Sequence, residues 1–142
     1  MRRAFAFTFL LILAACTSPA HGDDASSIDW DDGDSGTING MNFRLADVDA
    51  PETGGVGAAI GGTKCEAERA LGRDAKDYMQ ALTRSATLEI TADYAIDRYD
   101  RHVIDLEADG MDVGKSGLAA GHLRSWQHDG TKPLEERPNW CG

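Results

Sequence analysis

The chain has 142 residues, a length that fits one domain once any leader is removed. It carries 24 acidic against 14 basic side chains, for a formal net charge of −10. A balance this acidic argues against a surface that binds nucleic acid by broad electrostatic attraction, so any phosphate chemistry must depend on a few local cations.

The first residues have the pattern of an export signal. A short basic start precedes the uncharged run AFAFTFLLILAA, which is too short to cross a bilayer as a mature helix. The run ends in LAAC, which is similar to the lipobox of bacterial lipoproteins, where the chain is cut before an acylated cysteine. We therefore expect a signal peptide over residues 1–15, lipidation at Cys16 and a polar tether over 16–28. Ordinary cleavage after Ala20 is the alternative, and either route gives an exported protein, held on the cell envelope, periplasmic or secreted.

Two further cysteines remain if Cys16 carries lipid. An oxidising envelope favours a disulfide between Cys65 and Cys141, which would tie the C-terminus to the body of the domain. Closing so long a loop is worth roughly 4–5 kcal/mol in the chain-entropy account of disulfides. Two unpaired thiols are the alternative.

Residues 35–45, SGTINGMNFRL, predict a β-hairpin, because an Asn-Gly pair between two short strand-like runs is the strongest sequence signal for a two-residue turn. In the second run Phe43 and Leu45 face the core, whereas Arg44 lies on the opposite face. The uncharged, glycine-rich stretch 54–62 that follows predicts a connecting loop, with a flexible lid as the alternative, and it lacks the third glycine of a phosphate-binding GxGxxG.

Residues 65–84 predict an amphipathic helix with acids near its start and Arg84 at its end, as the helix dipole prefers. Its expected inward side chains are Leu71, Ala75, Tyr78 and Leu82. Gly72 lowers the stability of an isolated helix by about 1 kcal/mol relative to alanine.

Two alternating runs, TLEITAD and HVIDLEA, predict half-buried strands with Ile90 and Ile104 among the inward residues. A shorter helix over 112–122 follows, and the turn-rich C-terminal segment is expected along the surface. About five short strands with an inserted helix predict an α+β, mainly β fold, namely a five-stranded, partly open barrel of the OB-fold type with two or three helices.

Acidic side chains stand on both sides of the hairpin, with Asp34 before it and Asp49 and Glu52 after it. Because a hairpin returns its ends to the same place, we expect Asp34 and Asp49 to converge, and two carboxylates meeting at a strand end suit Ca²⁺ or Mg²⁺. The alternative is a solvated, turn-forming surface in which Arg44 makes a surface ion pair.

Two stretches together resemble the staphylococcal (thermo)nuclease family. They are DGDSGTINGMNFRLADVDAPET at 32–53 and DRYDR at 97–101, where family members show DGDT, RL-x-x-(I/V)D-(A/T)PE and D-(K/R)-Y-G-R. The resemblance covers about residues 30–123 and implies an OB-fold nuclease domain over 29–142. Asp100 departs from the family pattern, which has glycine at this position.

The resemblance implies roles for the acids. Asp34, Asp49 and the backbone carbonyl of Ala50 match the positions of the family's calcium ligands, and Glu52 matches the glutamate that activates the attacking water. The implied cofactor is therefore Ca²⁺.

The resemblance also implies a phosphate clamp. Arg44 and Arg101 match the two arginines that hold the scissile phosphate, and Tyr99 is a candidate for contact with the substrate. Tyr94, Tyr99 and Trp126 are candidates for stacking on a base, although packing against the core is the favoured interpretation for each.

These assignments imply a calcium-dependent endonuclease that hydrolyses phosphodiester bonds of DNA or RNA, or both, by attack of a glutamate-activated water. Nucleic acid is then the substrate, the membrane a partner through the lipid anchor, and a monomer is expected. One alternative is a non-catalytic OB-fold module of the cell envelope that binds an oligonucleotide or peptide. A third reading is a structural lipoprotein with a calcium-stabilised loop.

Overall fold

The computed structural model describes residues 27–129 and 132–142. The predicted signal peptide, the lipidation site Cys16 and nearly all of the predicted tether lie outside these residues. Within them, no helix is both long enough and apolar enough to span a membrane. The main sheet contains β1 (Ile28–Trp30), β2 (Ser35–Ile38), β3 (Met41–Leu45), β5 (Leu88–Ile96), β6 (His102–Ala108) and β7 (Met111–Asp112). The remaining elements are β4 (Val48–Asp49), β8 (Arg124–Ser125), α1 (Glu66–Thr83) and α2 (Val113–Ala119).

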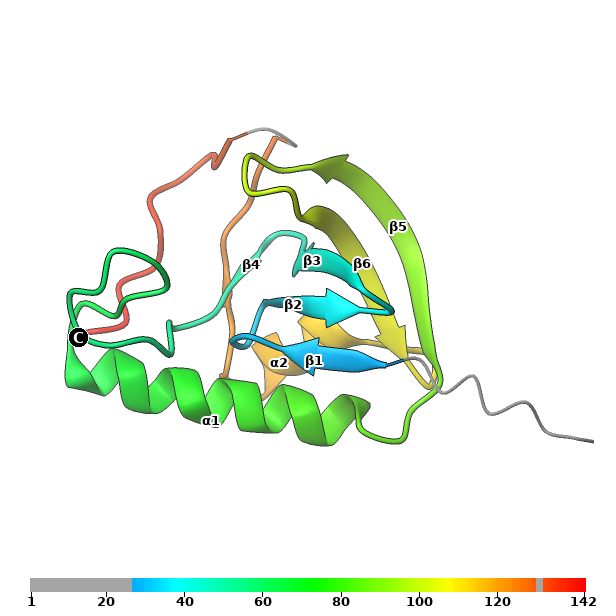
Figure 1. Cartoon of the computed structure of the whole chain (residues 1–142), viewed down its shortest axis with the longest axis horizontal. Helices are drawn as coiled ribbons and strands as arrows, with labels where there is room; N and C mark the ends of the chain where they lie inside the picture. Colours follow the sequence, from blue (N-terminus) through cyan, green and yellow to red (C-terminus); the bar gives the residue numbers. More distant parts are fainter. Residues whose placement is uncertain (1–26, 130–131) are drawn as a thin grey trace, which may run out of the picture.

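The strands follow the order β1-β2-β3-β6-β5, with β7 paired to β6, and β4 pairs with β8 in a separate ribbon. All pairs are antiparallel except β3 with β6, which run parallel. Figure 1 shows α1 running along one side of this strongly curved sheet. The prediction of an α+β, mainly β fold of the OB type is thereby confirmed.

The predicted hairpin forms as expected from its turn residues. β2 pairs with β3 from Ser35 opposite Arg44 to Ile38 opposite Met41. Asn39 and Gly40 have φ values of 49° and 82°, the left-handed geometry that a type I′ turn requires at both central positions. The hairpin therefore fixes where both of its ends lie.

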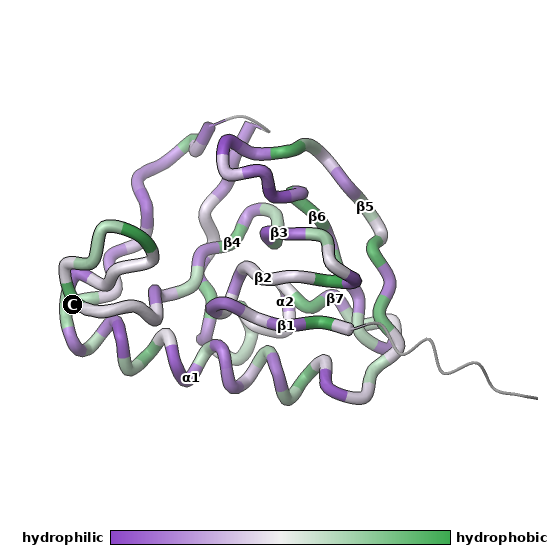
Figure 2. Tube along the Cα trace, viewed as in Figure 1, coloured by the Kyte–Doolittle hydropathy of each residue, from purple (hydrophilic) through white to green (hydrophobic). Residues whose placement is uncertain are grey.

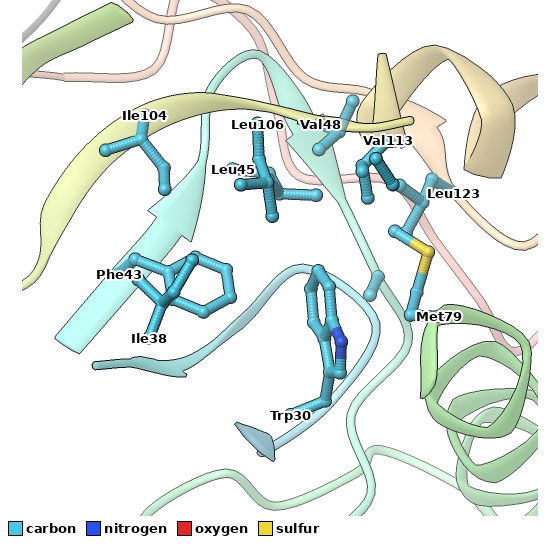
Figure 3. Packing of buried hydrophobic residues seen from close by; sticks show 12 residues of the cluster. Trp30, Ile38, Phe43, Leu45, Val48, Met79, Ile104, Leu106, Val113 and Leu123 are labelled. Carbon is cyan, nitrogen blue, oxygen red and sulfur yellow. The ribbon is translucent and has the colours of Figure 1, made fainter. Parts of the chain in front are cut away.

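The core lies between the sheet and α1. Trp30 and Phe43 pack edge to face with ring centroids 5.2 Å apart, and Met79 of α1 closes the cluster from the other side (Figure 3). Trp30 Nε1 donates a 3.0 Å hydrogen bond to Thr83 Oγ1 at the end of α1, so the indole is satisfied although it is buried. This packing holds α1 at a fixed distance from the first strands.

The predicted inward face of α1 is confirmed for Ala75, which is buried, and for Tyr78 and Leu82, which pack against the core, but not for Leu71. Alternating apolar and polar segments are visible along α1 in Figure 2, but its buried residues are Glu68, Gly72, Ala75, Met79 and Thr83. Leu71, which the sequence predicts to be inward, is 41% exposed. The buried face includes Gly72 because the helix approaches another backbone segment there, and a contact of that kind favours the smallest residue rather than an apolar one.

Gly72 lies directly against the chain that carries Glu52. A Cβ atom at this position would lie 2.1 Å from the carbonyl oxygen of Glu52, so the helix can approach that segment only because glycine has no side chain.

We expect Gly72→Ala to destabilise the protein by about 1–3 kcal/mol despite the better helix propensity of alanine, because the overlap is with backbone atoms. Urea unfolding measures the difference. Ala81→Gly on the exposed face of α1 serves as the control for propensity alone. A Gly72→Ala protein more stable than the parent would contradict this close approach.

Strand β5 is less regular than the alternation predicts. Its register with β6 shifts twice, between Ile90 and Ala92 and again between Asp93 and Ala95. Each shift changes which side chains face inward further along the strand. Ile90 lies before the first shift, in register with Leu106, and is 39% exposed on this edge strand. In β6 the prediction is confirmed, since Ile104 is fully buried.

The predictions for the second helix and for the C-terminal segment differ in how well they agree with the structure. The predicted second helix forms as the shorter α2, capped at its N-terminus by the side chain of Asp112. The C-terminal arm, residues 132–142, was expected along the surface, but this prediction is wrong in part because Trp140 is only 5% exposed. The predicted disulfide between Cys65 and Cys141 is present and joins the arm to the start of α1, as the chain path in Figure 1 shows.

Candidate functional site

The structure brings together the acids that flank the hairpin. Asp34 lies just before β2 and Asp49 lies in β4, and their exposures are 5% and 2%. The Ala50 N–H donates a 2.9 Å hydrogen bond to Asp34 Oδ2, which directly joins the two flanks. Asp32 orients this turn, because its Oδ1 accepts hydrogen bonds from the backbone N–H groups of Asp34 and Ser35 at 3.0 and 2.8 Å.

Asp34 lies in an environment that opposes ionisation. Burial and the neighbouring Asp32 carboxylate raise the pKa of Asp34 to about 7, although the Arg44 guanidinium and the Ala50 amide act in the opposite direction. Near neutral pH this carboxyl is therefore present in both its protonated and its ionised form.

This shift predicts pH-dependent stability in the presence of a chelator. The pKa of Asp34 is about 7 in the folded chain, against an ordinary value of 3.8. Because the folded state binds this proton more tightly than the unfolded state, the stabilisation is complete below pH 3.8 and is lost as the pH rises through about 7. We expect urea unfolding to show a free energy of unfolding that falls across this window. Asp34→Asn cannot ionise and should reduce the slope, whereas Asp29→Asn on the exposed face of β1 should not. Equal slopes for Asp34→Asn and the parent would contradict the assignment.

Both carboxylate oxygens of Asp49 bind side chains of the C-terminal arm. Arg137 Nε donates to Oδ1 at 2.8 Å, and Trp140 Nε1 donates to Oδ2 at 2.7 Å. Arg137 Nη2 also donates to the Ala50 carbonyl oxygen at 2.9 Å. Burial and the nearby Asp34 raise the pKa of Asp49, and the hydrogen bonds from Arg137 and Trp140 offset part of that rise.

Glu52 completes the acidic group. Its Oε1 lies 3.1 Å from Arg137 Nη2. Burial raises the pKa of Glu52, and Asp34 and Asp49 add to the effect while Arg137 opposes it. A carboxylate with a raised pKa is a stronger base, which is the property that activating a water molecule requires.

Glu68 supports this segment from α1. It is 2% exposed, its Oε1 accepts a 3.5 Å hydrogen bond from the Glu52 N–H, and its Oε2 accepts a 2.6 Å bond from the Lys64 N–H. Glu68 thus holds the backbone of Glu52 against the helix, at the level where Gly72 permits the approach.

Arg44 is fixed beside the acids. Its Nη2 donates to the Val48 carbonyl oxygen at 2.9 Å and lies 3.6 Å from Asp34 Oδ2. Its guanidinium lies 4.9 Å from the centroid of the Trp126 ring, a cation–π contact that helps to hold the side chain in one orientation.

Arg101 lies in the β5–β6 connection and pairs with Asp97 rather than with the acids. Its Nε and Nη2 donate to Asp97 Oδ2 at 2.9 and 2.7 Å. Burial would raise the pKa of Asp97, but these hydrogen bonds outweigh it and the pKa is lowered. Arg44 is in register with Val103 in the β3–β6 pair, and Arg101 lies two residues before Val103, immediately before β6 begins.

The aromatic candidates differ in exposure. Tyr94 and Tyr99 are 59% and 62% exposed, so the interpretation that they cover the core is wrong for both. The Tyr99 ring carries Arg98 at 4.8 Å and Arg101 at 5.2 Å from its centroid. Asp100 adopts a φ of 61°, the left-handed geometry for which the family pattern has glycine.

The oxygen donors of Asp34, Asp49 and Ala50 are of the chemical type that calcium prefers. In this arrangement, however, those of Asp49 and Ala50 accept hydrogen bonds from the arm. No cluster of three or more His, Cys, Asp or Glu side chains arranged to hold a metal occurs in residues 27–129 and 132–142. With the arm in place the predicted ligand set does not fit a calcium ion.

Sequence reasoning missed Glu68, Arg137 and Trp140. Glu68 lies seven residues before Ala75 and eleven before Met79, spacings that put all three on the same face of a helix. Extending the apolar face of α1 to charged residues could therefore have identified Glu68 as buried. No local pattern marks Arg137 or Trp140, because long-range contacts and the disulfide bring them to the site.

The family model described as "Staphylococcal nuclease homologue" matches residues 42–134, which is more than half of the chain. The match contains Arg44, Glu52 and Arg101, whereas Asp34 precedes it and Arg137 follows it. A comparison with curated proteins finds no match.

Proposed function

The chain belongs to the staphylococcal nuclease family, and from this premise we propose that it is an endonuclease that hydrolyses phosphodiester bonds of DNA, RNA or both. The observation that most supports the proposal is the placement of Glu52 and Arg44 around the Asp34–Asp49 pair. This is a base and a cation within one acidic group, next to the hairpin that the Asn-Gly turn predicts.

The arginines would stabilise the charge that develops on the phosphate. Attack by water adds negative charge to an already anionic phosphorus centre, and preorganised guanidinium donors lower that cost most effectively. Val48 and Trp126 hold Arg44, and Asp97 holds Arg101, so neither side chain has to be ordered when substrate binds.

Glu52 would act as the general base. In the proposed step the water oxygen bonds to phosphorus, its proton passes to Glu52, and the bond to the 5′-oxygen breaks as that oxygen takes up a proton from solvent. The 3′-phosphate ends expected from the family resemblance are the products of this direction of cleavage.

Calcium enters the proposal through the family resemblance and through the chemistry of the oxygen donors at Asp34, Asp49 and Ala50. The arm binds two of these three groups. Calcium would therefore compete with the arm for these oxygens.

The test is digestion of plasmid, single-stranded DNA and RNA by the purified protein, with calcium or with chelator, over a series of salt concentrations. We expect cleavage products with 3′-phosphate ends. Cleavage of none of the three substrates under any condition would contradict the proposal.

A non-catalytic OB-fold module is the second candidate. The hydrogen bonds of Asp49 to Arg137 and Trp140 favour it, because they occupy groups that a catalyst would need. Retention of an oligonucleotide without cleavage in the same assay would support the module over the enzyme.

We also propose that the protein works outside the cytoplasm, on a membrane through lipid at Cys16 or free after ordinary cleavage. The basic-apolar leader and the Cys65–Cys141 disulfide support this location. Labelled palmitate should enter the parent protein and not Cys16→Ser, and an unlabelled parent would rule out the anchor.

A further inference from the structure

Arg137 lies among the oxygen atoms that the family resemblance assigns to calcium and to the base. Its Nε is 2.8 Å from Asp49 Oδ1, and its Nη2 is 2.9 Å from the Ala50 carbonyl and 3.1 Å from Glu52 Oε1. Glu68 Oε1 lies 3.9 Å from the same nitrogen. One guanidinium therefore faces three carboxylates and one carbonyl.

The rest of the C-terminal arm fixes this position. Cys141 is bonded to Cys65 at the start of α1, and buried Trp140 donates to the second oxygen of Asp49. Arg124 packs over the Trp140 ring at 4.1 Å and donates a 2.6 Å hydrogen bond to the Asn139 carbonyl. The arm is thus restrained at three successive residues shortly after Arg137, which reduces the backbone freedom that is lost when the guanidinium is placed.

We propose that Arg137 is the resident cation of this acidic site, and that calcium binds tightly there only when the Arg137 guanidinium is absent or is withdrawn with the C-terminal arm. A divalent ion and the guanidinium would share the Asp49 and Ala50 oxygens at distances where two cations repel each other strongly. The inference depends on the proposed function only for the choice of calcium as the competing ion.

The proposal gives Arg137 a role that differs from a surface ion pair. Asp49 and Glu68 are each 2% exposed as side chains, so their charges need a partner whether or not an ion is present. With the arm docked, Arg137 supplies that partner and orients Glu52. With the arm withdrawn, the same carboxylates become available to a metal.

Calorimetric titration with CaCl₂, in the absence of nucleic acid, tests the proposal on the purified, oxidised protein. We expect Arg137→Gln to bind calcium at least about tenfold more tightly than the parent, a change of roughly 1.4 kcal/mol. Arg84→Gln removes the same charge from the exposed end of α1 and should leave calcium affinity at the parent value. Asp49→Asn added to Arg137→Gln should abolish the gain.

The double variant Cys65→Ser with Cys141→Ser supplies a second test that leaves every site side chain in place. Serine at position 65 keeps an acceptor for the Glu68 N–H at the helix start, so α1 retains its cap. Releasing the arm in this way should also increase calcium affinity. Far-UV circular dichroism confirms that each variant is folded, and an unfolded Arg137→Gln protein leaves the decision to the double variant.

Equal calcium affinity in the parent and in the folded variants would overturn the proposal, and so would variants that bind no calcium. The outcome is separable from that of the nuclease assay. A parent protein that cleaves nothing, together with a variant that gains calcium affinity, would refute the proposed function and support the role of Arg137. If the parent protein cleaves nucleic acid but the variants bind calcium no more tightly than the parent, the proposed function is supported and the role of Arg137 is refuted.

Discussion

Replacing Asp49 by alanine is expected to lower the free energy of unfolding by about 3 kcal/mol, the lower end of the range for removing one partner of a buried ion pair. Asp49 is 2% exposed and accepts hydrogen bonds from Arg137 and from Trp140. Its loss leaves the indole N–H buried without an acceptor and removes the closest partner of the guanidinium. The lower end applies because Arg137 keeps Glu52 as a partner.

One effect acts against this loss, since removing Asp49 also relieves its repulsion with Asp34. The pKa of Asp34 is about 7, so at a pH near 6 this neighbour is mostly protonated and the relief is small. Urea unfolding at that pH, in chelator, is the measurement. Asp29→Ala removes the same charge from an exposed position on β1 and should change stability by less than about 0.5 kcal/mol. If Asp49→Ala is no less stable than that control, the contacts of Arg137 and Trp140 with Asp49 do not stabilise the folded protein.

Replacing Glu52 by glutamine is expected to lower the rate of phosphodiester cleavage by about 10²–10⁴-fold, the usual contribution of a general base. Glutamine keeps the shape of the side chain beside Arg137, while the negative charge and the basicity are lost. Stability should change little. The measurement is the initial rate of DNA digestion at saturating substrate, paired with urea unfolding.

Glu136→Gln is the matched control, because it makes the same chemical change at an exposed position of the arm and should cleave at the parent rate. A Glu52→Gln enzyme as fast as Glu136→Gln would show that another group accepts the proton. A slow but unfolded variant would be detected by the unfolding curve and would not count as catalytic loss.

The parts of the fold that the sequence predicts are those determined by local chemistry. The turn at Asn39 and Gly40 needs left-handed backbone at two successive positions, and these two residue types provide it. That turn determines the ends of β2 and β3, so it also brings Asp34 and Asp49 together. The proximity of these acids was therefore predictable without knowledge of the rest of the fold.

The parts that were mispredicted depend on contacts between distant segments. An apolar pattern points to Leu71 as an inward residue, but backbone contact at Gly72 determines the buried face of α1. Alternation points to Ile90 as buried, but β5 is an edge strand and Ile90 is 39% exposed there. Arg137 reaches Asp49 from 88 residues away, guided by a disulfide whose consequences for the site no local pattern reveals.

Cys65 has a further consequence for how samples of this protein are made. The same residue caps α1 and holds the arm, since its Sγ accepts a hydrogen bond from the Glu68 N–H and is bonded to Cys141. A batch produced in a reducing cytosol would keep the cap and lack the covalent tie, whereas a batch secreted through an oxidising compartment would have both. The two would be different starting materials at identical sequence. Their assay results should be compared only after the thiol content of each batch has been titrated.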